Sequence, residues 1–528
     1  MKETKREISA RHNLKFRLVL ESLAIGAVTG VVISAFRIIT RHVSSVFIDF
    51  YSFGRSSLLH AAAMLLFLLC IGFLVGWMVK TDPLIGGSGI PQVSGQLRGL
   101  IRMNWRSILP LKFFGGILSV SAGLKVGREG PSIQMGAAVG QGFSEVFKRP
   151  NTERKFLISS GAAAGLASAF NAPLSGLVFA LEEVHHNFSS VALVSAMSAS
   201  LSAAVVSALI MGYEPVLLMG PSVHIPFAVY GYLILMAVLA SLSAFLFTGG
   251  ISVGKKIYAR LRIPVVWKVI LPFLITGSLI LLNAEFYGSG EPFILLPAGA
   301  NLPVGRLVFL YIVSGLLLVV AFCSGLPGGI FFPMLVLGSL FGNIFGQILV
   351  QFGLMDESLV LAFTVLSMCA YFSAIVRSPV TGILLILELT GSFDFLLTLG
   401  LVSLVSYLTA EFFHLKPVYE MLLGYQLHPE RLHASKLQKT EKQRGRREPS
   451  SILVEFPVYF NSLCDGRRIR EIDWPEDVLI VSIKRGDREI LPRGDVKLMG
   501  GDYLVFVQDA NQLDDMNEKI CSLTRNEP

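Results

Sequence analysis

The sequence predicts an all-α polytopic membrane domain followed by a small α+β domain. Of the 528 residues, 53% are apolar and only 16% are charged, and the mean hydropathy is +0.63. Long apolar runs continue to about residue 427, whereas from residue 452 apolar and polar residues alternate in short stretches. A soluble chain would carry more charge and shorter apolar runs. The first part is therefore expected to span a membrane and the second part to fold in water.

Cysteine usage and charge exclude several classes of protein. The five cysteines are scattered, so neither a secreted disulfide scaffold nor a CxxC metal site is expected. The net charge of +8 suits cytoplasmic flanks that face anionic lipid better than a nucleic-acid surface. We expect an integral membrane protein that binds no nucleic acid, holds no metal and is not an enzyme.

Ten apolar runs are long enough, or nearly so, to cross about 30 Å of hydrocarbon. They are 18–40, 59–79, 107–124, 190–212, 227–250, 266–284, 305–323, 334–350, 358–375 and 393–413. Seven further segments are short or interrupted by glycine and proline, as expected of half-helices that end inside a membrane. These are 87–98, 130–147, 155–168, 172–184, 328–340, 378–390 and 417–427.

Two basic segments flank the membrane domain, which we place at 18–430. Residues 1–17 are rich in Lys and Arg, and the linker 431–449 has a net charge of +5. By the positive-inside rule, both termini are cytoplasmic. The α+β domain, 450–528, contains short strand patterns such as ILVEFPVYF and GDYLVFV and is expected to end in a helix at 511–523.

The membrane domain contains an internal repeat. NAPLSGLVFALEE (171–183) and RSPVTGILLILEL (377–389) share Pro, Gly, Leu and Glu in register, and GREGPSIQMG (127–136) and GIFFPMLVLG (329–338) share Pro and Gly. The spacing between the two motifs is nearly equal in both halves, which favours a duplication over independent helix starts. We place the repeats at about 18–215 and 225–427. The sequence leaves open whether they are parallel or inverted.

Three motifs place glycines just before a helix start and proline near its first turn. They are GGSGIP (86–91), GREGP (127–131) and GGIFFP (328–333). Such helix ends carry partial positive charge and bare N–H groups, so several of them converging would bind a small anion. Ser88 adds a hydroxyl donor, although an ordinary helix cap explains it equally well.

Two glutamates are candidates for proton transfer. Glu129 stands between glycines at a helix start, where it either caps the helix or competes with an anion for the same N–H groups. Glu182 aligns with Glu388 in the repeat, which suggests a shared structural duty. Glu183 aligns with Leu389 and is therefore the better candidate for a proton relay. The adjacent histidines are interpreted as interfacial residues rather than metal ligands.

Together these motifs resemble the CLC family of chloride channels and chloride/proton exchangers, over essentially all of 18–427. The resemblance implies an inverted-repeat membrane domain and a homodimer with a separate pathway in each subunit. It implies chloride binding by Ser88, by the backbone amides of Ile330 and Phe331, and by the phenol of Tyr419. Glu129 would be the external gating glutamate and Glu183 the internal proton acceptor.

Antiporters of that family commonly have a carboxylate at the position that Glu183 resembles. Ser88 resembles the serine of the chloride-transporting members, whereas the fluoride-exporting branch differs at that position. We therefore expect a chloride/proton antiporter. Lys112, inside an apolar run, also fits the family and requires an acidic or carbonyl partner. A passive voltage- or pH-gated chloride channel is the nearest alternative. A potassium transport protein is a distant one, because no segment resembles the carbonyl filter TVGYG.

The C-terminal domain resembles the TrkA-C (RCK C-terminal) module of bacterial potassium transport regulators. Its turns GDREILPRGD and GGDYLVF carry the resemblance. The module implies a second dimer contact, a bacterial inner (plasma) membrane and a cytosolic effector such as cyclic di-AMP, although no effector ligands can be assigned. We interpret Arg485, Arg488 and Arg493 as solvated turn residues rather than phosphate ligands.

Overall fold

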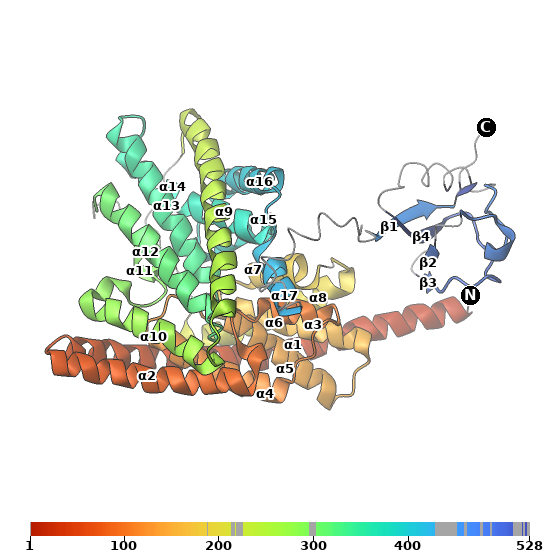
Figure 1. Cartoon of the computed structure of the whole chain (residues 1–528). Coiled ribbons are helices and arrows are strands. Elements are labelled where there is room, and N and C mark those ends of the chain that lie inside the picture. The colour runs from red at the N-terminus through yellow and green to blue at the C-terminus, as the bar shows by residue number, and fades with distance from the viewer. Residues whose placement is uncertain are drawn as a thin grey trace. The chain divides into compact units, whose positions relative to one another are not determined.

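The structure is a computed structural model whose chain divides into two compact units, residues 1–433 and 434–528 (Figure 1). The predicted linker 431–449 and most of the predicted helix 511–523 lie outside the described residues. The described residues are 2–186, 188–212, 217, 225–294, 302–427, 451–458, 462–475, 479–485, 488–509, 520 and 523–524.

The described part of the first unit consists of helices and the loops that join them, as predicted. The helices are α1 (Lys2–Gly54), α2 (Leu58–Thr81), α3 (Ile90–Leu97), α4 (Trp105–Ser121), α5 (Glu129–Val146), α6 (Asn151–Phe170), α7 (Pro173–Phe179), α8 (Ser190–Met211), α9 (Tyr230–Arg260), α10 (Val265–Leu282), α11 (Glu291–Ile294), α12 (Val304–Cys323), α13 (Phe331–Gln351), α14 (Val360–Val376), α15 (Pro379–Thr390), α16 (Leu396–Phe412) and α17 (Val418–Leu427).

Among the described residues, 8 helices are long and apolar enough to cross a membrane. They begin at Phe16 within α1, at α2, α8, α10, α12 and α13, and at the short 3₁₀ turns preceding α9 and α14. The first predicted span, 18–40, is part of a single helix of 53 residues. The segments predicted separately at 328–340 and 334–350 form one helix, α13.

Of the two half-helices predicted at 130–147 and 155–168, the first has the predicted length and the second is longer than predicted, and both are continuous helices. They form α5 and α6, with 18 and 20 residues. Both helices contain many small residues, which lower their hydropathy. The small residues allow the two helices to pack closely, since an added Cβ at Gly136 would overlap the carbonyl oxygen of Gly161. In the second half, α13 and α14 run side by side in the same way (Figure 1), and Gly342 packs against the backbone of Phe363.

Reciprocal glutamate caps join the two halves of the repeat. Glu388, near the end of α15, accepts the backbone N–H of Ser175 at the start of α7 at 2.7 Å. Glu182, just beyond α7, accepts the backbone N–H of Thr381 at the start of α15 at 2.9 Å. Each carboxylate thus caps the first turn of the other helix, as anionic groups do at helix N-termini. The two helices are therefore antiparallel, which makes the duplication an inverted repeat and confirms the shared structural duty of Glu182 and Glu388.

The second unit contains a four-stranded antiparallel sheet with strand order β1-β4-β2-β3. Its strands are β1 (Ser451–Pro457), β2 (Leu479–Arg485), β3 (Arg488–Ile490) and β4 (Asp502–Asp509). Alternate residues of the strands, including Phe456, Ile483, Leu504 and Phe506, are buried in one apolar core. The predicted α+β class is thus confirmed for this unit.

The environment of Arg485 differs from the prediction, which was a solvated turn residue. Its guanidinium donates to both carboxylate oxygens of the buried Asp502, at 2.7 and 2.8 Å, and this bidentate contact raises the pKa of Arg485. Asp502 also accepts the backbone N–H of Met499 at 2.9 Å. Arg493 is exposed, as predicted, and the side chain of Arg488 lies outside the described residues. Arg485 is therefore a structural residue of the sheet.

Replacing Arg485 by alanine is expected to destabilise the second unit by about 2–3 kcal/mol, because it leaves the buried Asp502 carboxylate without its charged donor. Urea unfolding of residues 434–528, followed by circular dichroism, measures the change. The matched control is Arg493→Ala, which removes an exposed arginine and should cost less than about 0.5 kcal/mol. Equal losses for the two variants would contradict the structural role of the ion pair.

Candidate ion-binding site

Backbone hydrogen bonds bring the three glycine-rich motifs together. The N–H of Gly87 donates to the carbonyl of Leu326 at 2.9 Å, and the N–H of Gly328 donates to the carbonyl of Gly87 at 3.1 Å. Gly127 and Gly329 exchange two such bonds, at 2.7 and 2.8 Å. The loops that begin α3, α5 and α13 therefore meet at one place, although they are far apart in the sequence.

Glycine is required at this junction. Gly89 precedes α3 with φ +91°, a conformation that strains other residues. Gly130 lies against the backbone of Ser88, whose carbonyl oxygen would be 2.6 Å from an added Cβ. The glycines thus allow helix N-termini to approach one another closely. The converging N-termini concentrate bare N–H groups and the positive ends of helix dipoles.

Ser88 at this junction and Tyr419 of α17 contribute two buried hydroxyl groups. Each side chain is only 2% exposed. The Tyr419 hydroxyl has no hydrogen-bond partner, and the Ser88 hydroxyl accepts only a long contact of 3.4 Å from the N–H of Ile90 among the described residues. A buried hydroxyl without an acceptor retains a free donor. Both groups are therefore available to an anion.

The predicted amide ligands lie at the start of α13. Ile330 caps this helix and Phe331 is its first residue, so their N–H groups are among those that have no partner within the helix. Both residues are fully buried. The ring of Phe179 joins this helix start to Tyr419, since its centroid lies 5.6 Å from that of Phe331 and 6.5 Å from that of Tyr419. The Phe179 ring thus connects Tyr419 with the predicted amide ligands of α13, while Ser88 contacts the start of α5.

Glu129 is the first residue of α5 and lines a large cavity. Its side chain is 2% exposed, and its carboxylate lies close to the backbone N–H of Phe332 at the start of α13. Its Oε2 atom is folded over Gly127, where an added Cβ would overlap it, and accepts no hydrogen bond from the residues that the structure describes. The carboxylate therefore occupies a position where an anion would meet the same helix ends.

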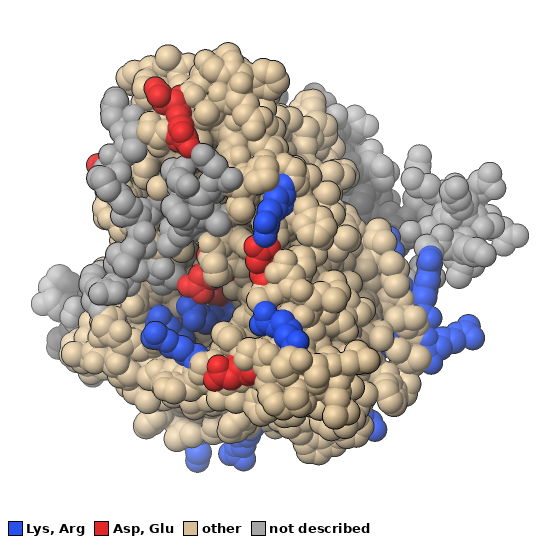
Figure 2. Space-filling view, turned by 90° about the vertical axis from the view of Figure 1, so that its left-hand side faces the viewer, with Lys and Arg blue, Asp and Glu red and all other residues tan. Residues whose placement is uncertain are grey.

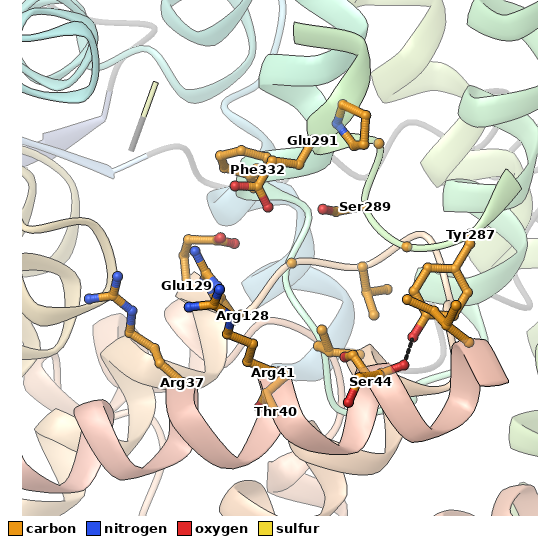
Figure 3. A pocket seen from close by; sticks show the side chains of 18 of the residues that line it. Arg37, Thr40, Arg41, Ser44, Arg128, Glu129, Tyr287, Ser289, Glu291 and Phe332 are labelled. Carbon is orange, nitrogen blue, oxygen red and sulfur yellow. Dashed lines mark hydrogen bonds between the residues drawn. The ribbon is translucent and has the colours of Figure 1, made fainter. Parts of the chain in front are cut away.

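The cavity beside Glu129, which we call the outer cavity, has a volume of about 650 Å³ (Figure 3). Arg37 and Arg41 of α1, Arg128, and Glu291 of α11 line it together with Glu129. Figure 2 shows basic and acidic side chains close together near the middle of one face of the molecule. The spacing of two arginines four residues apart in an apolar helix was the signal that could have revealed this cavity from the sequence.

Glu183 lies in a π-helical turn, Ala180–His185, that follows α7. Such turns are rare and occur frequently at functional sites. Its side chain is 5% exposed, and its Oε2 atom accepts the hydroxyl of Ser378 at 3.0 Å. The Tyr419 phenol is within electrostatic range of both Glu183 and Glu129. The two predicted proton-transfer residues therefore both act on the same phenol electrostatically.

The two carboxylates face opposite sides of the first unit. Glu183 lies near the exposed ion pair between Arg98 and Glu420, whose charged atoms are 3.7 Å apart. Arg98 follows α3 on the side where α5 ends, because Gln96 donates to Gln141 at 2.8 Å. On that side the segment that follows α5 forms an ion pair with the beginning of α1. The outer cavity is lined instead by residues 37–48 of α1.

A second, smaller cavity of about 180 Å³ leads to Ser88, and we call it the Ser88 cavity. Its wall includes Gln92 of α3, Lys255 of α9 and Tyr425 of α17. Lys112 is not part of this wall. Its ammonium group donates to the carbonyls of Ile85 and Gly87, both at 2.7 Å, which supplies the carbonyl partners that the sequence required.

Comparison with known proteins supports the interpretation of both units. A family model described as voltage gated chloride channel matches residues 71–411, and a TrkA-C domain model matches residues 453–520. The chain is 35% identical over 367 residues to the H(+)/Cl(-) exchange transporter ClcA of Cronobacter sakazakii, covering 67% of this chain and 78% of that protein.

Two further similarities cover most of the membrane domain. The chain is 32% identical over 453 residues to the ClcA exchange transporter of Vibrio cholerae, covering 83% of this chain and 95% of that protein. The crystal structure of a slow cyanobacterial Cl⁻/H⁺ antiporter superposes with a TM-score of 0.73 at 28% identity, covering 78% of this chain and 98% of that chain.

Proposed function

Because the chain belongs to the voltage-gated chloride channel (CLC) family, we propose that it is a secondary active transporter that exchanges chloride for protons. The observation that carries this proposal is the pair of buried carboxylates, Glu129 and Glu183, which face opposite sides of the first unit and both influence the Tyr419 phenol electrostatically. A passive channel needs a path for the anion, whereas an exchanger also needs groups that carry protons.

In this proposal, chloride binds among the Ser88 hydroxyl, the Tyr419 phenol and the backbone amides of Ile330 and Phe331. These donors carry partial charges rather than a full positive charge, so they attract the anion without trapping it. Chloride and the Glu129 carboxylate compete for the helix ends. Protonation of Glu129 removes its charge and releases the position to chloride.

Glu183 receives protons from the opposite side. Its carboxylate is held by the Ser378 hydroxyl close to the exposed Arg98–Glu420 pair, through which solvent protons can approach. The proton then passes toward Glu129 through the region that contains Tyr419. The anion and the proton thus meet in one region, although the proton enters through Glu183 and the anion through Ser88. Such a shared region allows the movement of one ion to depend on the other.

Reconstitution tests the proposal. The purified protein is placed in liposomes, a chloride gradient is imposed with the membrane voltage clamped at zero, and external pH is recorded. Exchange predicts uphill proton movement driven by chloride. Chloride flux without proton movement would show a channel instead, and absence of both fluxes would contradict transport of chloride by this chain under these conditions.

We also propose a homodimer, formed through the membrane domain and the TrkA-C domain, in a bacterial inner membrane. Both termini would be cytoplasmic, because the segments 1–17 and 431–449 are basic. In this orientation Glu183 faces the cytoplasm and the outer cavity faces away from it. The Ser88 cavity would also face the cytoplasm, because its wall includes Tyr425, a few residues before the basic linker.

Deleting residues 450–528 is expected to leave chloride/proton exchange intact while removing its response to cyclic di-AMP. The TrkA-C domain forms a separate compact unit, whereas the ion-binding residues belong to the first unit. Exchange rates of the full-length and truncated proteins, each with and without cyclic di-AMP, test this prediction. Calorimetry that shows no cyclic di-AMP binding to the full-length protein would contradict the effector.

A further inference from the structure

Two lysines lie near Ser88, and their surroundings differ. The Lys112 ammonium group is fully buried and is held by two carbonyl oxygens at 2.7 Å, so it fixes the loop before α3. Lys255 instead lines the Ser88 cavity, and so does Phe322, which its ammonium group contacts. The contacts of this ammonium group are a carbonyl oxygen of Phe322 at 3.5 Å and the face of the Phe322 ring at 5.1 Å. These contacts are too long to use its three donors fully.

The Ser88 cavity is suited to an anion. The residues described on its wall include no Asp or Glu, whereas the outer cavity contains two glutamates. The loop of Gly87 and Ser88 contributes the start of α3 to the wall. With about 30 Å³ for each water molecule, a cavity of about 180 Å³ holds a small anion together with several waters. An ion can therefore enter before it has lost its whole hydration shell.

We propose that Lys255 forms an entry site for chloride in the Ser88 cavity, where its ammonium group binds the partly hydrated anion and passes it to Ser88. This inference rests on the proposed function, since it assumes that chloride uses this cavity. An ammonium group is a compact, strongly hydrated charge on a flexible stem, so it can follow the ion over a short distance. Because the cavity keeps water, the attraction is moderate and the anion can leave again.

The alternative is a structural role in which the Lys255 stem covers Phe322. The neighbouring residue provides a matched control, because Lys256 is on the same helix, carries the same charge and does not line the cavity. Successive residues of a helix point about 100° apart. Lys255→Gln and Lys256→Gln therefore change the net charge equally and differ only in where that charge is removed.

The test is the chloride concentration that gives half-maximal exchange in liposomes, measured for the full-length chain and its variants. Lys255→Gln should raise it about tenfold, as expected for the loss of a unit charge at short range in a partly hydrated site. Lys256→Gln should change this chloride concentration less than about twofold. Lys255→Arg keeps the positive charge and should therefore have a value close to that of the wild type. The ratio of protons to chloride should stay unchanged, since both carboxylates remain.

The outcomes separate this inference from the proposed function. Equal chloride dependence in Lys255→Gln and Lys256→Gln would overturn the entry site while leaving exchange established. A wild-type chain that moves no chloride would overturn the proposed function itself. If Lys255→Gln is too slow for flux measurements, calorimetric titration of the purified variants with sodium chloride makes the same comparison, and unchanged affinity would again overturn the entry site.

Discussion

Glu129→Gln is expected to abolish proton transport completely while chloride transport persists. Glutamine has nearly the same shape, so α5 and the surrounding glycines need not rearrange. It carries no charge and accepts no proton at the acid–base conditions of the cell, so it can neither exchange protons nor compete with chloride as a carboxylate does. The position of the Glu129 carboxylate beside the start of α13 makes this competition direct.

The measurement is chloride-driven proton pumping in liposomes, recorded beside chloride flux for the same preparation. Glu285→Gln is the control, because Glu285 forms an ion pair with Arg306 and does not line the outer cavity. That variant should keep the wild-type ratio of protons to chloride. Proton pumping that survives in Glu129→Gln would remove Glu129 from the proton pathway and leave it as a helix cap.

Local patterns in the sequence were sufficient to predict where the short helices begin. Glycine before the helix and proline in its first turn mark the starts of α3, α5 and α13, and proline alone marks the starts of α7 and α15. These residues have direct steric meaning, because proline starts helices and glycine permits close backbone approach. The alignment of Glu182 with Glu388 predicted a shared role. It could not predict that each caps the other helix, because only their antiparallel packing creates those hydrogen bonds.

Other parts of the site depend on tertiary contacts that leave weak local signals. Backbone hydrogen bonds join Gly87 to Gly328 and Gly127 to Gly329, and no side-chain pattern encodes them. Lys255 follows the apolar run 227–250 and therefore resembles an ordinary basic flank, although α9 continues to Arg260 and places it beside Ser88. The hydropathy of α5 and α6 was misleading because small residues are used there for close packing.

Glu183→Gln is expected to abolish proton transport from the opposite side while leaving chloride transport. The Glu183 carboxylate is buried, accepts one hydroxyl from Ser378 and lies in a π-helical turn. A glutamine amide oxygen can accept the same hydroxyl, so the variant should fold and keep its anion ligands. It cannot carry a proton, and Glu129 would then be cut off from the side on which Arg98 and Glu420 are exposed.

Glu182→Gln provides the matched control, because it changes the adjacent carboxylate by the same single atom. Glu182 caps α15 through Thr381, so this variant should lose about 1 kcal/mol of stability and retain the wild-type ratio of protons to chloride. Measuring both variants by chloride-driven proton pumping separates proton transfer from helix capping. If Glu182→Gln uncouples transport and Glu183→Gln does not, the roles assigned to the two neighbours must be exchanged, and the π-helical turn would then serve to orient the cap rather than the proton acceptor.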